Sequence, residues 1–265
     1  MNKEHIVSVE QSLCNRCGLC AKDCSHDIWK VDNRGAEITS QDCPKCGHCV
    51  AVCPRGAIAI SGFDDAPEEI HPEMKPDPDN LFTMIKNRRS TRQFTEQDVP
   101  NEIIEKIIEA GRYTPTAMNR QGVSYVVLRD KKDEYEKIAI SWWRRLIPIV
   151  SIIIKHFRHM NIDDQYCFKG APVVIVVKSD NVSFGAMDIV DGALAASAME
   201  LMARSYGLGV LYSGAFTNAV KFSRKLKRKL SVVSHGKVVI ALVIGYPAVK
   251  YHRTAQRERP VVQYD

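Results

Sequence analysis

Eight of the nine cysteines lie between positions 14 and 53, where one spacing occurs twice. The first copy comprises Cys14, Cys17, Cys20 and Cys24, and the second comprises Cys43, Cys46, Cys49 and Cys53. Three thiolates on so tight a loop can reach three iron corners of one cubane cluster, while the fourth, carried away by a short helical turn, ligates a second cluster. The repeat therefore predicts a small domain organised around two 4Fe–4S clusters.

The spacing also predicts how the eight thiolates are shared. Because the fourth cysteine of each copy reaches the other cluster, each cluster takes three ligands from one copy and one from the other. One cluster is expected to bind Cys14, Cys17, Cys20 and Cys53, and the other Cys43, Cys46, Cys49 and Cys24. Gly18 and Gly47 occupy matching places inside the two loops, where the backbone must pass close to the inorganic core.

Zinc and disulfide bonds are the alternative uses of clustered cysteines. A zinc ribbon needs only two C-x2-C pairs, so the third and fourth cysteines of each copy would be superfluous. A secreted, disulfide-rich domain is disfavoured because the first ten residues have no apolar stretch typical of an export signal. We therefore expect reduced cysteines and a cytoplasmic location. Cys167, far outside the repeat, is predicted to be an inert thiol.

Over residues 5–62 the sequence resembles the bacterial-type two-cluster ferredoxins. Pro54 follows the last cysteine of the repeat, whereas Ser25 stands where that family usually has another proline. Residues 63–80 are rich in proline and acidic residues and have no apolar period, which predicts an extended linker that opposes helix and strand alike. We expect a ferredoxin-like domain in residues 1–62 and a larger domain in residues 81–265.

Charge is distributed unevenly between these parts. Residues 1–80 contain eight Lys or Arg and fourteen Asp or Glu, a net charge of −6, and the remainder carries +12. No nucleic-acid-binding motif accompanies the basic part, so no nucleic-acid partner is expected. A basic run at residues 221–229 suits either docking of an acidic partner such as a ferredoxin or a solvated helix face.

The longest apolar run, residues 146–154, contains Pro148. It is far shorter than the ~20 residues of a membrane span. The run therefore predicts a buried or site-covering helix and no membrane contact. Just before it, Trp142 and Trp143 either roof a substrate pocket or pack in the core.

Beyond the linker, the apolar pattern alternates between helix and strand. Residues 101–111 carry isoleucines at helical spacing, and residues 187–206 read as a long helix rich in small residues. Apolar runs at residues 124–128, 172–177 and 238–244 predict buried strands. Together they predict an α+β fold, a mixed sheet with flanking helices. The small residues suit close helix packing, either at a subunit interface or within one chain.

Four motifs stand in the larger domain: residues 88–94 (RRSTRQF), residues 114–121 (TPTAMNRQ), residues 208–209 with 212–216 (LG and YSGAF), and residues 245–247 (GYP) with Arg257 and Arg259. In these motifs and their order, this part of the chain resembles the FMN-binding nitroreductase family. The resemblance implies an FMN-dependent enzyme and covers residues 81–265.

The resemblance also implies roles for individual residues. The ribityl-phosphate and the ring edge of FMN would be held by Arg88, Arg89, Ser90 and Arg92, and Arg257 and Arg259 would close over the phosphate. Guanidinium groups suit a dianionic phosphate because they bind it bidentately. The flavin of a neighbouring subunit would be contacted by Pro115, Thr116, Ala117 and Asn119, which implies a homodimer. The reactive flavin edge would lie against the backbone of Ser213, Gly214 and Ala215.

These features predict an iron–sulfur flavoprotein oxidoreductase. Electrons enter at the clusters, cross to FMN and leave to an electron-poor organic acceptor such as a nitroaromatic or a quinone, with ferredoxin or NAD(P)H as the donor. In one alternative, electrons run from NAD(P)H through FMN to the clusters and a ferredoxin. In another, the protein is an electron carrier or redox sensor without a substrate. No side chain is identifiable as a catalytic acid or base.

Overall fold

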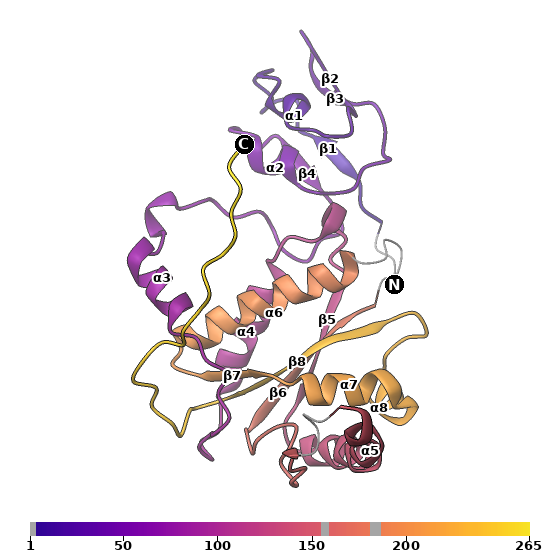
Figure 1. Cartoon of the computed structure of the whole chain (residues 1–265). Helices are drawn as coiled ribbons and strands as arrows, with labels where there is room; N and C mark the ends of the chain where they lie inside the picture. Colours follow the sequence, from indigo (N-terminus) through magenta and orange to yellow (C-terminus); the bar gives the residue numbers. More distant parts are fainter. Residues whose placement is uncertain (1–3, 155–158, 181–186) are drawn as a thin grey trace. The chain divides into compact units, whose positions relative to one another are not determined.

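The structure is a computed structural model, and it describes residues 4–154, 159–180 and 187–265. The chain forms two compact units (Figure 1). Unit 1 comprises Met1–Lys75 with Met118–Arg120, and unit 2 comprises Pro76–Ala117 with Gln121–Asp265.

Unit 1 is built from two short antiparallel strand pairs and two short helices. Its strands are β1 (Val7–Val9), β2 (Trp29–Asp32), β3 (Gly35–Ile38) and β4 (Ile58–Ile60), and its helices are α1 (Leu19–Lys22) and α2 (His48–Val52). Strand β1 pairs with β4, and β2 pairs with β3. Val7, Trp29 and Ile58 form its core together with the thiols of Cys20 and Cys49. So small an apolar core is typical of a domain that a metal centre stabilises.

The two copies of the cysteine repeat adopt matching backbones. Helices α1 and α2 each begin after a glycine in the left-handed conformation, Gly18 with φ 74° and Gly47 with φ 80°. Two residues earlier, Arg16 and Lys45 also have positive φ, 61° and 59°. No protein atom would lie within 4 Å of a Cβ at either glycine, so what the structure shows at these positions is the left-handed turn.

Residues 63–80, expected to oppose helix and strand alike, contain two helical starts. A 3₁₀ turn, η1, spans Pro72–Met74, and helix α3 spans Pro78–Lys86. The Asp77 side chain caps α3 by accepting a hydrogen bond from the Asn80 backbone N–H at 2.8 Å. Proline is tolerated at the first position of a helix because its missing N–H would have no helical partner there. The expectation that this segment opposes helix was therefore wrong at Pro72–Met74 and again from Pro78 onward.

Unit 2 is organised around a four-stranded sheet in the order β5-β6-β8-β7, with all neighbours antiparallel. The strands are β5 (Val123–Leu128), β6 (Val173–Ser179), β7 (Gly209–Tyr212) and β8 (Lys237–Gly245). The three predicted strands are β5, β6 and β8, and β7 is an addition. Strand β6 is buried along its whole length, as its continuous apolar run indicates.

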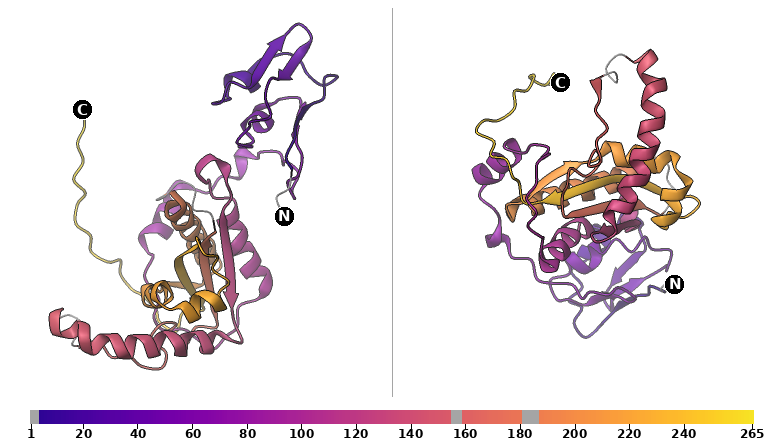
Figure 2. Two further views of the ribbon diagram at one scale, coloured as in Figure 1. Left: turned by 90° about the vertical axis from the view of Figure 1, so that its right-hand side faces the viewer. Right: turned by 90° about the horizontal axis from the view of Figure 1, so that it is seen from below.

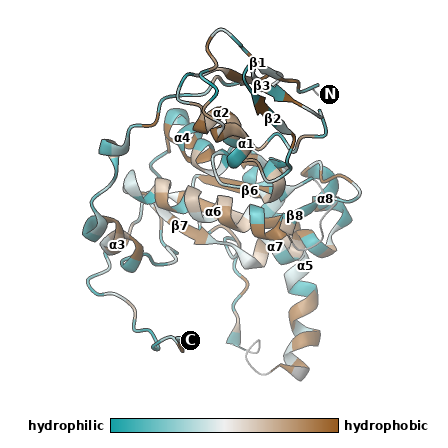
Figure 3. Ribbon diagram, turned by 90° about the horizontal axis from the view of Figure 1, so that it is seen from above, coloured by the Kyte–Doolittle hydropathy of each residue, from teal (hydrophilic) through white to brown (hydrophobic). Residues whose placement is uncertain are grey.

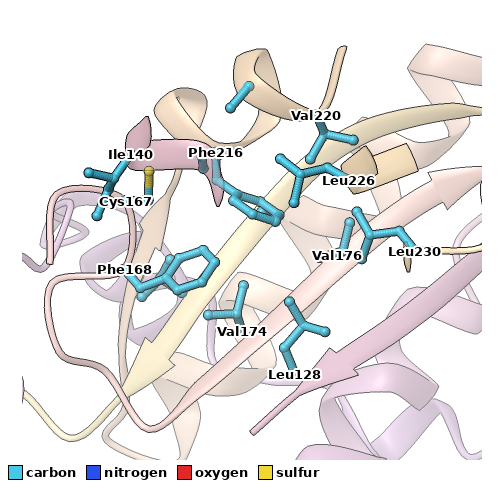
Figure 4. Packing of buried hydrophobic residues seen from close by; sticks show 14 of the residues in the cluster. Leu128, Ile140, Cys167, Phe168, Val174, Val176, Phe216, Val220, Leu226 and Leu230 are labelled. Carbon is cyan, nitrogen blue, oxygen red and sulfur yellow. The ribbon is translucent and has the colours of Figure 1, made fainter. Parts of the chain in front are cut away.

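Helices cover both faces of this sheet, which confirms the predicted α+β architecture. Helices α4 (Asn101–Arg112) and α6 (Met187–Ser205) share one core cluster with Val173, Ile175 and Val177. Helices α5 (Lys132–Ile153), α7 (Gly214–Phe222) and α8 (Arg224–Lys229) share the other with Val174 and Val176 (Figures 1 and 4). Successive β6 side chains thus point to opposite faces.

Small residues of α6 let it pack closely on the sheet. A Cβ on Gly192 would lie 2.6 Å from a methyl group of Val239, so no larger residue fits there without displacement. Ala195 and Ala196 are also buried. The opposite side of α6 is different, because Ile189, Val190 and Leu194 are each more than 40% exposed.

Trp142 and Trp143 pack against α7 and its surroundings. Trp142 stacks on Phe222 with ring centroids 5.6 Å apart, and Trp143 donates a hydrogen bond from Nε1 to the Ala215 carbonyl at 2.9 Å. Of the two roles that the sequence allowed for this pair, the structure shows packing.

The apolar run after these tryptophans continues α5 beyond the sheet (Figure 2). Ile149 and Ile152 are 64% and 74% exposed, so the end of this helix is not buried, and a helix that covers a site stays a prediction. Hydropathy colouring shows the apolar residues at the end of α5 (Figure 3). Within the described ranges, no helix combines the length and apolarity that a bilayer crossing needs.

Candidate functional site

One pocket of unit 1 is lined by the four thiols that the sequence assigns to one cluster. Its cysteines are Cys14, Cys17, Cys20 and Cys53, and its apolar lining includes Val9, Val31, Ala36, Ala57 and Ile58. Cys14 and Cys17 lie on the loop that leads into α1, Cys20 lies within α1, and Cys53 follows α2. The fold thus brings a cysteine of the second copy to the loop of the first.

The thiols of the second loop also lie near one another. Burial, together with the neighbouring Cys43 and Cys46 thiols, raises the pKa of the Cys49 thiol to about 11. Cys24 packs in the same core of unit 1. Its place in the second ligand set remains a prediction. All nine cysteines are free thiols, with no disulfide bond among them.

The surroundings of these thiols fit an iron–sulfur cluster. The Lys45 backbone N–H donates to Cys43 Sγ at 3.3 Å, and the Ala57 N–H donates to Cys53 Sγ at 3.3 Å. Such hydrogen bonds stabilise thiolate charge and tune cluster potentials. Among the residues that the structure describes, no three His, Cys, Asp or Glu side chains are placed to hold one metal ion. A four-iron cluster binds each thiolate at a separate iron, which suits four thiols around one pocket.

In unit 2, the structure brings three of the four flavin motifs together. Ser90 forms a parallel bridge with Val210 of β7, and Phe94 forms an antiparallel bridge with Pro247 after β8. The Tyr251 hydroxyl donates to the Ser90 carbonyl at 3.3 Å. Residues 88–94 therefore lie along the β7 edge, next to the strand that leads directly to Ser213.

Arg88 is held by a buried acid that the sequence did not single out. Its Nη1 donates to Glu200 Oε2 at 2.9 Å, and the Glu200 side chain is only 9% exposed. The Tyr212 hydroxyl donates to the same oxygen at 3.0 Å, and Arg204 Nε lies 3.9 Å from the other. Arg204 also donates to the Arg89 carbonyl. Burial raises the pKa of Tyr212 and lowers that of Arg204. The one sequence feature that could have identified Glu200 as a site residue is its charge within a helix of small apolar residues.

The segment expected at the reactive flavin edge is the N-terminus of α7. Ser213 caps the helix by accepting from the Phe216 N–H at 3.2 Å, and its hydroxyl donates to the Cys167 carbonyl at 2.8 Å. Gly214 is exposed, with open space where a Cβ would stand. The first backbone N–H groups of a helix have no partner inside it and favour an acceptor or a negative charge. The backbone of Gly214 and Ala215 can therefore donate to a bound ring.

The second group of flavin residues follows α4 at a different place. The Ala117 N–H donates to both carboxylate oxygens of Asp191 at 3.1 and 3.2 Å, and Thr116 Oγ1 accepts from the Gln121 N–H at 3.0 Å. Asp191 and Glu200 stand nine residues apart on α6. At 1.5 Å per residue their backbones lie about 13 Å apart. Within one chain, the contact of Ala117 with Asp191 is therefore separated from the contact of Arg88 with Glu200. Asn119 has a left-handed backbone with φ 50°, and Pro115 is exposed.

For the remaining predicted residues the structure shows exposure, and their roles stay predictions. Arg92, Arg257 and Arg259 are exposed. No ion pair joins them to an acidic group anywhere in residues 4–154, 159–180 and 187–265. The chain after β8 continues as an extended segment without regular structure (Figure 2).

Comparisons with known proteins agree with both units. Residues 85–246 match the nitroreductase family, and residues 13–58 match the 4Fe–4S dicluster domain. An FMN reductase (NADPH) of Bacillus subtilis is 24% identical over 173 residues, which span 64% of this chain and 66% of that protein.

Solved structures share the fold of unit 2. An FMN-dependent nitroreductase of Clostridium difficile superimposes with a TM-score of 0.57 at 16% identity, covering 71% of this chain and 100% of its own. A nitroreductase with bound FMN from Bacteroides fragilis gives 0.56 at 21% identity, covering 69% and 98%. With the family match spanning more than half of the chain, the protein belongs to the nitroreductase family of FMN-dependent oxidoreductases and carries a 4Fe–4S dicluster domain ahead of it.

Proposed function

We propose that the protein passes electrons between two 4Fe–4S clusters and FMN and reduces an electron-poor organic acceptor such as a nitroaromatic or a quinone. The observation that carries this proposal is the union of a dicluster domain and a nitroreductase domain in one chain. Bound FMN would supply the exchange of one or two electrons, while the protein supplies position and electrostatics. We assign residues 1–62 to the clusters and residues 81–265 to the flavin.

The residues of unit 2 would bind the flavin as follows. The phosphate is held by Arg88 and Arg89, with Ser90 and Arg92 on the same segment, and Glu200 keeps the Arg88 guanidinium in place. The backbone N–H groups of Gly214 and Ala215 face the ring edge from the N-terminus of α7. Arg257 and Arg259, exposed on the extended C-terminal segment, close over the phosphate.

We further propose a homodimer in which each flavin receives residues from both chains. Its support is the apolar outer side of α6, with Ile189 46% and Leu194 48% exposed, and the exposed isoleucines at the end of α5. Exposed apolar side chains of this kind typically mark an interface. The partner's flavin is then contacted by Pro115, Thr116, Ala117 and Asn119. The reason is that Asp191, the residue of α6 that binds Ala117, lies away from Arg88.

The homodimer predicts a mass twice the 29.8 kDa of one chain in light scattering. Replacing Leu194 with glutamate is expected to dissociate it, because a charge would be buried in the interface without a partner. FMN would be lost in parallel. The control is Ile70→Glu, at an 81% exposed position outside this surface, which should leave mass and flavin unchanged. A wild-type monomer that retains FMN would contradict the proposal.

The electron donor separates the leading function from its alternatives. Relatives named NADPH-dependent oxidoreductase, such as one from Staphylococcus haemolyticus at 23% identity, favour NADPH as a second candidate donor. We expect the anaerobically purified protein to reduce a quinone or nitroaromatic with reduced ferredoxin, and Cys46→Ala to slow this at least tenfold while FMN stays bound. Steady-state turnover with ferredoxin, NADH and NADPH measures the activity of the wild type and its decrease in Cys46→Ala. Turnover with NADPH alone, unaffected by Cys46→Ala, would favour the second candidate. Absence of turnover with every donor would indicate an electron carrier or sensor.

A location in the cytoplasm is part of the proposal, because no disulfide joins the cysteines and thiols that ligate clusters persist in a reducing compartment. The basic residues of α8 provide a docking surface for a ferredoxin donor. Leu226 is buried, whereas Arg224, Lys225, Lys227 and Arg228 are exposed on the outer side of the helix. Cationic patches of this kind accelerate association with acidic partners.

A further inference from the structure

Glu136 on α5 is a buried carboxyl group outside the site described above, with 5% of its surface exposed. Its Oε1 accepts two hydrogen bonds from consecutive backbone N–H groups, from Cys167 at 2.9 Å and from Phe168 at 2.6 Å. A buried carboxyl group that organises a loop in this way is costly to desolvate, so its partners matter.

One peptide group connects this carboxyl group to the proposed flavin edge. The peptide between Cys167 and Phe168 donates its N–H to Glu136 and accepts, through the Cys167 carbonyl, the Ser213 hydroxyl at 2.8 Å. Ser213 is the cap of α7. Hydrogen bonds that pass through one peptide group polarise each other, so a stronger acceptor at Glu136 strengthens the bond to Ser213.

Two further contacts tie the same loop and helix to α5. The Phe168 ring packs on the Phe216 ring of α7 with centroids 4.8 Å apart (Figure 4). Trp143, two helical turns after Glu136 on α5, donates to the Ala215 carbonyl at 2.9 Å. The N-terminus of α7 is therefore held from α5 both directly and through the Cys167–Phe168 peptide.

The titratable and charged groups around Glu136 come from two elements. On α5 they are Asp133 and Lys132, and on the loop they are Cys167 with Asp163 and Lys169 beside it. Residues 214–220 of α7 carry no charge. Burial raises the pKa of Glu136 to about 7, against the effect of its two backbone donors. Both charge states of the carboxyl group are thus accessible near neutral pH.

We propose that Glu136 is a positioning residue whose charge state controls how firmly the Cys167–Phe168 peptide holds Ser213 and the N-terminus of α7 against the flavin. This inference rests on the proposed function. The charged carboxylate is the stronger acceptor and holds the segment firmly. The neutral acid accepts more weakly, and the backbone of Gly214 and Ala215 is then less well aimed at the ring.

The test uses the full-chain holoenzyme between pH 5.5 and 8.5, with two readouts. The first is the visible absorption and circular dichroism of the oxidised flavin, and the second is the single-turnover rate of flavin reoxidation by a quinone. In the wild type we expect one spectral titration near pH 7 and a rate that rises about fivefold across it, the effect of one hydrogen bond. Glu136→Gln should show neither the spectral titration nor the rise in rate. At every pH its flavin spectrum and reoxidation rate should equal those of the wild type at low pH. The control is Glu134→Gln, which removes an exposed acid on the same helix and should titrate as the wild type does.

Ser213→Ala provides a second test, because it cuts the bridge without altering the carboxyl group. The flavin titration should disappear in this variant too. The proposal would be overturned if the flavin of Glu136→Gln or of Ser213→Ala titrated as it does in the wild type. It would also be overturned if the reoxidation rate of Glu136→Gln were below that of the wild type by the same factor at every pH. If Glu136→Gln fails to fold, Ser213→Ala decides alone. A wild type that binds no FMN would refute the proposed function, whereas bound FMN without a titration would refute only the role of Glu136.

Discussion

Replacing Cys53 with alanine is expected to eliminate the cluster that Cys14, Cys17 and Cys20 bind, although Cys53 belongs to the other copy of the repeat. The reason is geometric, because Cys53 lines the same pocket as those three thiols. Iron content should fall from about eight to about four atoms per chain. Iron and sulfide assays on anaerobically purified protein measure this loss, and electron paramagnetic resonance of the reduced protein shows which cluster is missing.

Three variants complete this experiment. Cys17→Ala should lose the same resonance signal as Cys53→Ala, and Cys46→Ala should lose the other. Cys167→Ala is the matched control, since Cys167 is buried in unit 2, and it should retain about eight iron atoms. If Cys53→Ala instead lost the signal that Cys46→Ala loses, the exchange of the fourth ligand between the two copies would be wrong.

Replacing Glu200 with alanine is expected to be the most destabilising change in unit 2. Arg88 and Arg204 would lose their shared carboxylate, and the Tyr212 hydroxyl would lose an acceptor. Breaking a buried ion pair on one side costs about 3 kcal/mol, because the remaining charge stays buried without a partner. The Arg204 side chain, only 15% exposed, is the group left in that state. FMN should also bind more weakly, since Arg88 would no longer be held toward its phosphate.

Thermal unfolding followed by circular dichroism and titration with FMN measure the two effects. Glu200→Gln keeps an acceptor for Tyr212 and should lose less stability than the alanine variant. Glu109→Ala is a matched control, because it breaks an ion pair with Arg112 whose side chains are 44% and 42% exposed. Such exposed pairs contribute less than about 1 kcal/mol. Equal stability of Glu200→Ala and Glu109→Ala would show that the buried network does not support the site.

Some site residues were predictable because their signal is local. Gly18 and Gly47 were singled out by their matching places in the two thiol loops, and the structure adds that both have a positive φ. Ser213 was named from a motif, and the structure adds that its hydroxyl is already used by a carbonyl, so only backbone donors remain for a ligand. Pro78 shows the limit of this reasoning. A proline that opposes the interior of a helix also favours its first position, and the choice depended on Asp77 as the cap.

By itself, the sequence determined the paired thiol loops, the strands β5, β6 and β8, and the helices α4 and α6. Each of these elements follows from the spacing of residues a few positions apart, because backbone geometry and side-chain periodicity determine local structure over that range. Only the tertiary structure decided which acids support the proposed flavin site. Glu200 meets Arg88 across 112 positions, Asp191 meets Ala117 across 74, and Glu136 meets Cys167 across 31. A buried carboxyl group takes its partners from whichever segments the sheet and its helices bring beside it, and no local pattern encodes that choice.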